Sequence, residues 1–237
     1  MPTSLIDPPR TRTREPEYRK ISLSPVARMA LIALLFVAIA IFWRKQLHYQ
    51  YFPKRWAVVY NRGLYRSGQL SQSLVRRVLQ DNQIDVVVDL TGVEPGNSDQ
   101  RAEEKACDEL RIEHFRFPLK GDGTGDLTNY AQAVHCVDEA LENHQRVLVH
   151  CAAGIHRTGG VLAMYKLHVL GESANEITRG LNEFGFWDEA VNAKLIPFLN
   201  ENREAMAEHI RQTGSPARNP REVPLLGDDA VQADADH

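Results

Sequence analysis

The segment VLVHCAAGIHRTGGVLAMYKL, residues 147–167, carries most of the information in this chain. Its apolar start, Val147–Val149, predicts a buried strand, and Gly160–Leu167 predicts a helix, with a short glycine-containing loop between them. Such a loop collects unpaired backbone N–H groups that bind anions such as phosphate. Cys151 opens the loop and Arg157 closes it. We expect the positive field to favour the thiolate of Cys151, and Arg157 to hold two phosphate oxygens.

The loop resembles the Cys-x5-Arg signature of cysteine-dependent phosphatases, in the form shared by the protein tyrosine and dual-specificity families. The matching positions are His150, Cys151, Gly154, Arg157, Thr158 and Gly159. The resemblance implies an α/β fold of the compact dual-specificity type, with a central, mostly parallel sheet flanked by helices. It also implies hydrolysis of phosphomonoesters through a cysteinyl-phosphate intermediate, with no metal and no cofactor.

Each position of the loop has an expected role. Cys151 attacks phosphorus while Arg157 and the loop N–H groups stabilise the equatorial oxygens. The resemblance implies that Thr158 hydrogen-bonds the sulfur and that His150 orients the loop. The loop positions expected to surround the bound phosphate are Ala152, Ala153, Gly154, Ile155 and His156.

The leaving oxygen needs a proton, so a carboxylic acid is expected near the loop. In this superfamily the acid is an aspartate on a mobile loop that follows a strand before the cysteine, which here is the glycine-rich segment 118–126. Asp122 lies nearer the family's spacing and has no evident local role. Asp126 directly precedes a predicted helix, so helix capping explains it without chemistry. Asp122 is the favoured acid and Asp126 the alternative.

The variable loop positions also bear on the substrate. Ala152, Ala153 and Ile155 are apolar and only His156 is ionisable, whereas a substrate with several phosphates needs several cations. A phosphorylated protein, on tyrosine, serine or threonine, is therefore the leading hypothesis. Lys120 adds one cation nearby, so a lipid or inositol phosphate stays open as an alternative. A non-catalytic phosphate-binding module is the rival of a different class.

A second feature is the apolar stretch before the domain. Met29–Trp43 holds no charged residue, and Val26–Ala27 extends it past Arg28. Residues 26–43 therefore predict a single transmembrane anchor in the lipid bilayer, at the short end of the required length. A cleaved signal peptide, with Ala38–Ala40 as the site, and a buried helix of the soluble domain are the alternatives. Basic residues flank both ends, so the side of the membrane on which the domain lies stays open.

The expected organisation is a basic disordered tail (1–25), the anchor (26–43), a juxtamembrane linker (44–55), a phosphatase domain (56–211) and a disordered acidic tail (212–237). The formal charge of −3 gives no indication of nucleic-acid binding. The three cysteines lack paired spacing, which argues against a disulfide scaffold and a zinc site. Cys107 and Cys136 are expected to be packing residues, with a reversible disulfide to Cys151 as the alternative.

Strands alternate with helices along the domain, which is typical of an α/β architecture. Two short segments, Tyr65–Gln69 and Val88–Leu90, resemble the opening strands of small bacterial members of the superfamily and are expected to be structural. Strands are expected at Trp56–Tyr60, Leu64–Arg66, Ile84–Leu90 and Ile112–Leu119, with a turn at Asn61–Gly63. Helices are expected at Ser71–Asn82, Ser98–Leu110, Asn129–Asn143, after a capping box at Ser173–Glu176, and at Trp187–Ile210 with a kink at Pro197.

Overall fold

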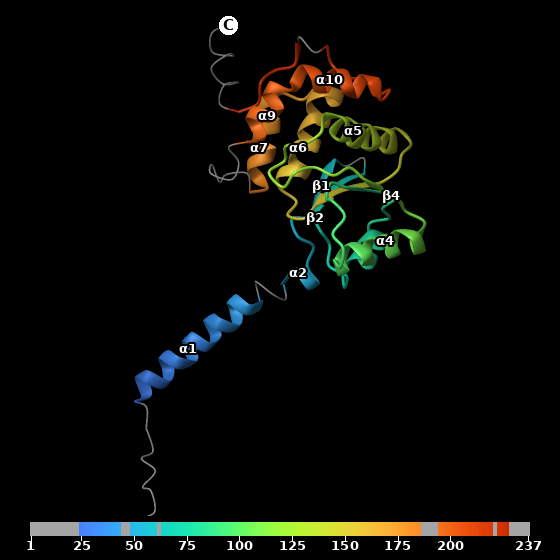
Figure 1. The fold of residues 1–237 in the computed structure, drawn as a ribbon. Helices are drawn as coiled ribbons and strands as arrows, with labels where there is room; N and C mark the ends of the chain where they lie inside the picture. Colours follow the sequence, from blue (N-terminus) through green and yellow to red (C-terminus); the bar gives the residue numbers. More distant parts are fainter. Residues whose placement is uncertain (1–23, 44–47, 61–62, 186–193, 220–221, 228–237) are drawn as a thin grey trace, which may run out of the picture. The chain divides into compact units, whose positions relative to one another are not determined.

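The computed structural model describes residues 24–43, 48–60, 63–185, 194–219 and 222–227 (Figure 1). The chain divides into two compact units, Met1–Trp43 and Arg44–His237. Most of the basic tail, turn residues 61–62, residues 186–193 at the start of the last predicted helix and the acidic end from residue 228 lie outside the described residues.

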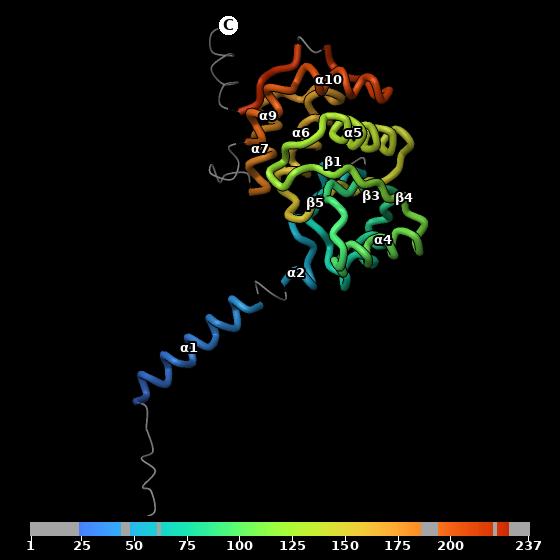
Figure 2. Tube along the Cα trace, in the orientation of Figure 1, coloured from blue at the N-terminus to red at the C-terminus, as the bar shows by residue number. Residues whose placement is uncertain are grey.

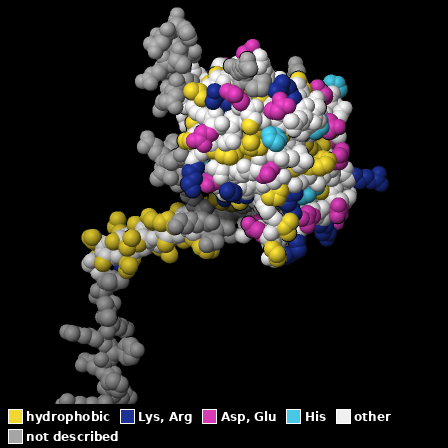
Figure 3. All heavy atoms as spheres, turned by 45° about the horizontal axis from the view of Figure 1, so that its top comes forward, with side chains coloured by type: hydrophobic (Ala, Val, Ile, Leu, Met, Phe, Trp, Pro, Cys, Tyr) yellow, Lys and Arg dark blue, Asp and Glu magenta, His cyan; other side chains and the backbone are white. Residues whose placement is uncertain are grey.

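The described part of the first unit is helix α1 (Pro25–Phe42), which ends at Trp43. Ser24 caps its N-terminus by accepting a hydrogen bond from the Ala27 N–H at 3.2 Å. None of its residues is buried, and Figure 3 shows hydrophobic side chains along its visible face. Its 18 residues span about 27 Å at about 1.5 Å per residue. By length and composition, α1 is therefore able to cross a membrane.

The second unit is built on a five-stranded sheet in the order β1-β2-β5-β3-β4. The strands are β1 (Ala57–Tyr60), β2 (Leu64–Gly68), β3 (Val86–Asp89), β4 (Glu113–Arg116) and β5 (Val147–Cys151). Only β1 is antiparallel to its neighbour; the other pairs are parallel. The central strand β5 is buried at every residue, which explains its apolar sequence. The mostly parallel sheet predicted from the sequence is confirmed.

Helices cover both faces of the sheet, as Figures 1 and 2 show. Val87 and Leu148 point to a core shared with helices α3 (Val75–Asp81) and α4 (Ser98–Leu110). Val86, Val88 and Val149 point to the other, larger core. That core is closed by α5 (Leu127–Glu142), α6 (His156–Met164) with its π-helical extension η2 (Tyr165–Leu170), α7 (Ala174–Glu183), α9 (Leu195–Glu201) and α10 (Arg203–Gln212). The alternation of neighbouring valines between the two cores is the period of a strand buried on both faces.

The last helical stretch differs from its prediction. Pro197 lies in the first turn of α9, where its missing N–H has no intrahelical partner to lose, so the helix does not kink there. The break comes at Asn202, whose dihedral angles (φ −102°, ψ 7°) are not helical, and α10 begins after it. The capping box predicted at Ser173 and Glu176 is present at the start of α7.

The chain beyond residue 212 also differs from its prediction of disorder, as far as Gly227. Val223 and Leu226 are buried in the larger core. The Leu226 N–H and C=O both hydrogen-bond the side chain of Asn200, at 2.8 and 2.9 Å. The segment is rich in proline and charged residues, so its composition predicted disorder although Val223 and Leu226 pack in the core.

The segment predicted as a linker is folded onto the domain from residue 48 onward. His48–Tyr51 forms a single helical turn, α2. The Ser73 hydroxyl donates to the Gln50 carbonyl at 2.8 Å, and the Gly68 N–H donates to the Lys54 carbonyl at 2.6 Å. These contacts place residues 48–55 beside the carboxyl end of β2.

Candidate active site

The signature loop leaves the carboxyl end of β5 and enters α6. In the register of the sheet, Cys151 pairs with Gly68 of β2, and His150 pairs with both Ser67 of β2 and Asp89 of β3. α6 begins at His156, four residues before the predicted start at Gly160, so Arg157 and Thr158 belong to its first turn. The N-terminus of the helix therefore forms part of the loop and points its positive end at it.

Gly154 lets the loop lie directly on β2. Its φ of +73° is in the left-handed region that favours glycine. A Cβ at this position would lie 2.6 Å from the Gly68 nitrogen and 2.7 Å from the Ser67 carbonyl, closer than side chains allow. The glycine of the signature is thus a steric requirement of the fold.

Cys151 is buried at the base of the loop, 1 % exposed. The Gly154 N–H donates to its sulfur at 3.2 Å. Burial by itself raises the pKa of the thiol. The adjacent Thr158 hydroxyl, the Arg157 charge and the backbone N–H groups outweigh it, so that the pKa of Cys151 lies below its ordinary value. The Thr158 hydroxyl is fully buried and has no hydrogen-bond partner of normal geometry among the described residues.

Arg157 is held at one end only. Its Nη1 donates to the Leu90 carbonyl at 3.4 Å. Its Nε is buried and has no hydrogen-bond partner in the part of the chain that the structure describes. A buried guanidinium N–H without an acceptor is unfavourable unless a bound anion accepts its hydrogen bond. The side chain is therefore arranged to receive an anion at the loop.

His150 leads behind the loop into a buried charged cluster. Its Nε2 lies 3.0 Å from Glu103 Oε1 and 3.9 Å from Asp89 Oδ1, and all three side chains are at most 1 % exposed. Burial opposes ionisation of both members of the His150–Glu103 pair, but their mutual attraction prevails. The pKa of His150 is raised and the pKa of Glu103 is lowered. The pair is thus a buried ion pair directly preceding the cysteine.

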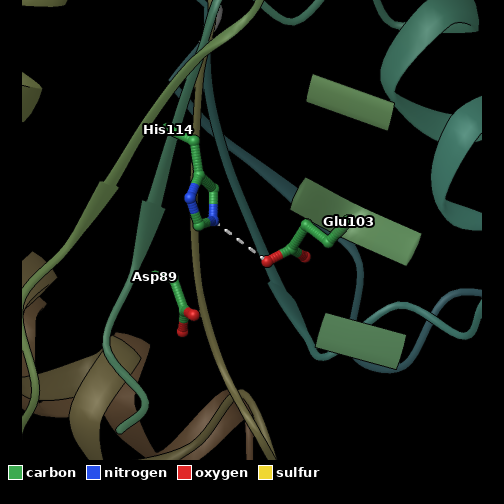
Figure 4. A group of neighbouring side chains, drawn as sticks. All are labelled: Asp89, Glu103 and His114. Carbon is green, nitrogen blue, oxygen red and sulfur yellow. Dashed lines mark hydrogen bonds and ion pairs between the residues drawn. The ribbon is translucent and has the colours of Figure 1, made fainter. Parts of the chain in front are cut away.

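The cluster has two further partners, a histidine and an arginine. His114 Nε2 lies 3.3 Å from Glu103 Oε1, the contact drawn in Figure 4. Arg116 Nε donates to Asp89 Oδ2 at 2.8 Å. Ligand atoms of Asp89, Glu103 and His114 lie within 4.8 Å of one another, a spacing that a metal ion also requires. Because each carboxylate already pairs with a cationic side chain, the arrangement fits internal neutralisation better than a metal centre.

The glycine-rich loop contacts the signature loop from the other side. A Cβ at Gly123 would lie 3.2 Å from His156, and the Gly123 carbonyl accepts a hydrogen bond from the buried Tyr130 hydroxyl. The charges of Cys151 and Asp122 both contribute, after burial, to raising the pKa of Tyr130. Asp122 therefore lies on the same side of the domain as the cysteine sulfur.

The two candidate acids differ in their contacts. Asp122 accepts from the Thr124 hydroxyl at 2.8 Å and lies 3.4 Å from Lys194 Nζ. The hydrogen bond from Thr124 is the main reason that the pKa of Asp122 lies below its ordinary value. Asp126 caps α5 by accepting from the N–H groups of Thr128 and Asn129, at 2.8 and 3.1 Å. Asp126 thus has the structural task expected from the sequence.

The other positions of the signature loop differ in their exposure to solvent. Ala152 is exposed, Gly154 is buried, and Ala153, Ile155 and His156 are half-buried. The other cysteines are free, like Cys151. Cys107 lies in the α3–α4 core, on the opposite side of the sheet from Cys151. Burial raises the pKa values of Cys107 and Cys136 to about 12, which makes them poor nucleophiles.

The residues that support the loop from behind were not predicted from the sequence. Glu103 lies within the predicted helix Ser98–Leu110, and Asp89 and Arg66 belong to segments that were expected to be structural. Glu103 shares the buried stripe of α4 with Gln100, Ala106 and Cys107. Glu103 is spaced so that it falls on the buried face of the helix, and a buried carboxylate needs a cation nearby. That spacing was the signal in the sequence that could have identified Glu103.

Comparison with known proteins agrees with a cysteine-dependent phosphatase loop at residues 150–159. Residues 65–171 match the family described as "Polymorphic toxin system, DSP-PTPase phosphatase". Curated protein sequences give no significant match. Among solved structures, TpbA of P. aeruginosa is similar at 22% identity and a TM-score of 0.51, covering 65% of this chain and 88% of that one. A TpbA variant in complex with pTyr is similar at 20% identity and a TM-score of 0.51, covering 69% and 98%.

A yeast structure is similar to the same degree. The core catalytic domain of Siw14 from S. cerevisiae, described as a PP-IP phosphatase, shares 18% identity and a TM-score of 0.53, covering 70% of this chain and 97% of that one. Identities this low show a common fold and leave the substrate undetermined. The family match and the signature loop agree with that fold. The region of residues 65–171 therefore belongs to the superfamily of cysteine-dependent phosphatases that includes the protein tyrosine and dual-specificity phosphatases.

Proposed function

We propose that this domain hydrolyses phosphomonoesters on proteins through a cysteinyl-phosphate intermediate. The Cys151 thiolate attacks phosphorus in line, forming an S–P bond while the P–O bond to the leaving group breaks. Arg157 and the loop N–H groups stabilise the charge on the equatorial oxygens. Water then attacks the phosphorus, the S–P bond breaks and inorganic phosphate leaves. Thr158 stabilises the departing sulfur through its hydroxyl.

One observation carries the proposal: a buried thiol with a lowered pKa beside an arginine whose Nε has no partner in the described chain. The thiolate supplies the nucleophile and the guanidinium supplies the anion clamp. Neither arrangement serves the packing of the core, because each places a polar or charged group where an apolar one is more stable. The pairing of the two supports catalysis over simple phosphate binding.

Asp122 is the proposed general acid in the first step and general base in the second. Its neighbour Gly123 packs closely against His156 of the signature loop, whereas Asp126 is committed to the cap of α5. Its carboxylate is ionised in the present contacts with Thr124 and Lys194. Closure over a bound phosphate dianion removes water and adds negative charge, and both changes raise the pKa of the carboxyl group. Protonation of Asp122 is thus coupled to substrate binding.

The surroundings of the loop favour a protein substrate over a polyphosphate. A cavity of about 260 Å³ adjoins Ala152. Its lining includes one cation, Lys54, and two carboxylates, Glu94 and Asp99, together with amide and hydroxyl groups. A second phosphate would meet net negative charge there. Amides and hydroxyls suit the backbone and polar side chains of a peptide.

The test of the chemistry is hydrolysis of an aryl phosphate by the full chain in detergent micelles. Cys151→Ser is expected to reduce the rate to that of the uncatalysed reaction. The matched control, Cys136→Ser, removes a thiol of raised pKa and is expected to keep wild-type activity. A wild-type chain that binds inorganic vanadate yet hydrolyses no aryl, peptide or lipid phosphate would indicate the non-catalytic module instead.

The substrate class is tested by competition between substrates. We expect a higher kcat/KM for a phosphotyrosyl or phosphoseryl peptide than for an inositol pyrophosphate or a phosphoinositide in mixed micelles. A preference for the inositol compounds would overturn the assignment of a protein substrate while leaving the mechanism in place.

We further propose that α1 anchors the chain in a membrane as a single-pass protein. Apart from Arg28, its 18 residues are apolar, and none of them is buried, which supports insertion into lipid. Resistance of the full chain to carbonate extraction from membranes is the expected result. Release into the soluble fraction, or an intact mass that lacks the first forty or so residues, would favour a cleaved signal peptide.

A further inference from the structure

The outer side of the signature loop is held by three donors on consecutive carbonyls. The Gln69 N–H donates to the Ala152 carbonyl at 3.3 Å. Arg55 Nη1 donates to the Ala153 carbonyl at 3.0 Å. Arg66 Nη2 donates to the Gly154 carbonyl at 2.8 Å. Arg55 precedes β1, Arg66 lies within β2 and Gln69 directly follows β2, so all three donors are far from the loop in sequence.

These bonds fix which way the peptide N–H groups point. In a trans peptide the carbonyl and the following N–H point in opposite directions. Holding the carbonyls of residues 152, 153 and 154 on the outside therefore turns the N–H groups of residues 153, 154 and 155 inward. The Gly154 N–H is seen in this orientation, directed at the Cys151 sulfur at 3.2 Å. The outer bonds thus organise the inner surface that receives phosphate.

Of the three donors, Arg55 lies outside the part of the chain that matches the phosphatase family, residues 65–171. It belongs to the segment His48–Arg55, five to twelve residues after the end of α1 at Trp43 in the sequence. Its backbone adopts a left-handed conformation, φ +50°, which is uncommon for arginine. That turn directly follows Lys54, whose carbonyl accepts the 2.6 Å bond from Gly68. The segment is therefore docked on β2, and the Arg55 side chain reaches the loop.

The guanidinium groups of Arg55 and Arg66 lie close enough to repel each other. Arg66 is 4 % exposed and stacks on the Phe184 ring, with its guanidinium carbon 3.7 Å from the ring centroid. Burial, and to a smaller extent the charge of Arg55, lower the pKa of Arg66 to about 10. Two cations that repel each other persist here because each satisfies its own carbonyl of the loop.

We propose that Arg55, on the segment that links α1 to the domain, is a positioning residue of the catalytic site. It holds the 153–154 peptide with its N–H turned toward the bound phosphate. The inference rests on the proposed phosphatase function. It adds that the functional domain begins at the segment 48–55, so that this segment tunes catalysis and is more than a tether.

The test compares Arg55→Ala with Arg77→Ala in the full chain. Arg77 is the matched control, since it donates to the Tyr51 carbonyl of the same segment at 3.5 Å but has no contact with the loop. Arg55→Ala is expected to lower kcat on an aryl phosphate and to weaken inhibition by inorganic vanadate, each about tenfold, the effect of losing one charged hydrogen bond. KM is expected to change less than kcat. Arg77→Ala is expected to leave both quantities at wild-type values.

Arg55→Lys keeps a cation and a donor, and it is expected to fall between Arg77→Ala and Arg55→Ala in both measurements. If the alanine variant does not fold, the comparison of Arg55→Lys with Arg77→Ala replaces it, and equal kcat values then overturn the proposal. A loss in Arg55→Ala no larger than that in Arg77→Ala also overturns it. An active wild-type chain keeps the proposed function intact in either case, so that the two failures are distinguishable.

Discussion

The signature loop and the glycine-rich loop meet across the active site, and they are built in opposite ways. The signature loop is tied down by three carbonyl contacts outside and by a buried ion pair behind His150. The glycine-rich loop is held at Asp122 by a local turn with Thr124 and an exposed contact with Lys194. The nucleophile and the anion clamp need fixed geometry, whereas a general acid must change its protonation state and its exposure to water. Each loop has the rigidity that its chemistry requires.

The largest effect is expected from a substitution at Arg157 of the signature loop. Arg157→Lys replaces a planar fork by a single ammonium, and we expect kcat on an aryl phosphate to fall about 10³-fold. Arg146→Lys is the control, because Arg146 binds the Asn82 carbonyl at the other end of β5. Steady-state kinetics of the two variants provide the measurement. A loss confined to KM would mean that Arg157 binds substrate without stabilising the transition state.

The next effect is expected on stability, from the ion pair behind the rigid loop. Glu103→Gln leaves His150 buried without its anion, and we expect the free energy of unfolding to fall by about 3 kcal/mol. Glu104→Gln is the control: Glu104 pairs with Arg116 at 3.0 Å but is half-exposed, so a loss below about 1 kcal/mol is expected. Urea unfolding of the full chain in micelles measures both. An equal loss of unfolding free energy in the two variants would mean that the His150–Glu103 ion pair does not stabilise the signature loop.

The same pair predicts a pH dependence. The raised pKa of His150 stabilises the fold fully below its ordinary value of 6.5, and this contribution is lost as the pH rises through the folded value. The lowered pKa of Glu103 stabilises the fold above its ordinary value of 4.5, and this contribution is lost as the pH falls through the folded value. The advantage of the wild type over Glu103→Gln is therefore greatest between pH 4.5 and 6.5. An advantage that grows above pH 6.5 would contradict the ion pair.

A smaller effect is expected in the glycine-rich loop. Asp122→Asn removes the proton donor, and kcat on an alkyl phosphate is expected to fall about 10²-fold. The loss on an activated aryl phosphate should be smaller, since that leaving group needs less help. Asp126→Asn is the control, because asparagine is an equally good N-cap. A leaving-group-dependent loss in Asp126→Asn alone would exchange the two roles.

The smallest effect is expected at the edge of that loop. Lys194→Ala removes an exposed contact worth at most about 1 kcal/mol, so kcat should stay within about fivefold of the wild type. Lys194 contributes, after Thr124, to the lowered pKa of Asp122. Its removal should therefore raise that pKa and move the alkaline limb of the kcat/KM profile, where the general acid loses its proton, to higher pH. A shift to lower pH would place the acid elsewhere.

The sequence predicted the rigid loop well because its residues act on near neighbours. Cys151, Gly154 and Thr158 are linked by the geometry of one strand–loop–helix turn, which a local pattern records. The supports of that loop were missed because they come from other segments: Arg55 is 98 residues from Ala153, and Glu103 lies on helix α4 whereas His150 lies in strand β5. Pairing across a sheet is set by topology, and a single sequence does not encode it in spacing. Disorder was wrongly predicted for the described residues 213–219 and 222–227 for a similar reason, since Leu226 is anchored by the distant Asn200.

The central claim is that Cys151 becomes covalently phosphorylated during turnover. Rapid acid quenching of the full chain with an aryl phosphate, followed by peptide mass spectrometry, tests it directly. The account predicts one added phosphoryl group on the peptide that contains Cys151, formed in the first turnover, present in Cys136→Ser and absent from Cys151→Ser. Product formation with no phosphoryl group on that peptide, or with the group on another residue, would contradict it.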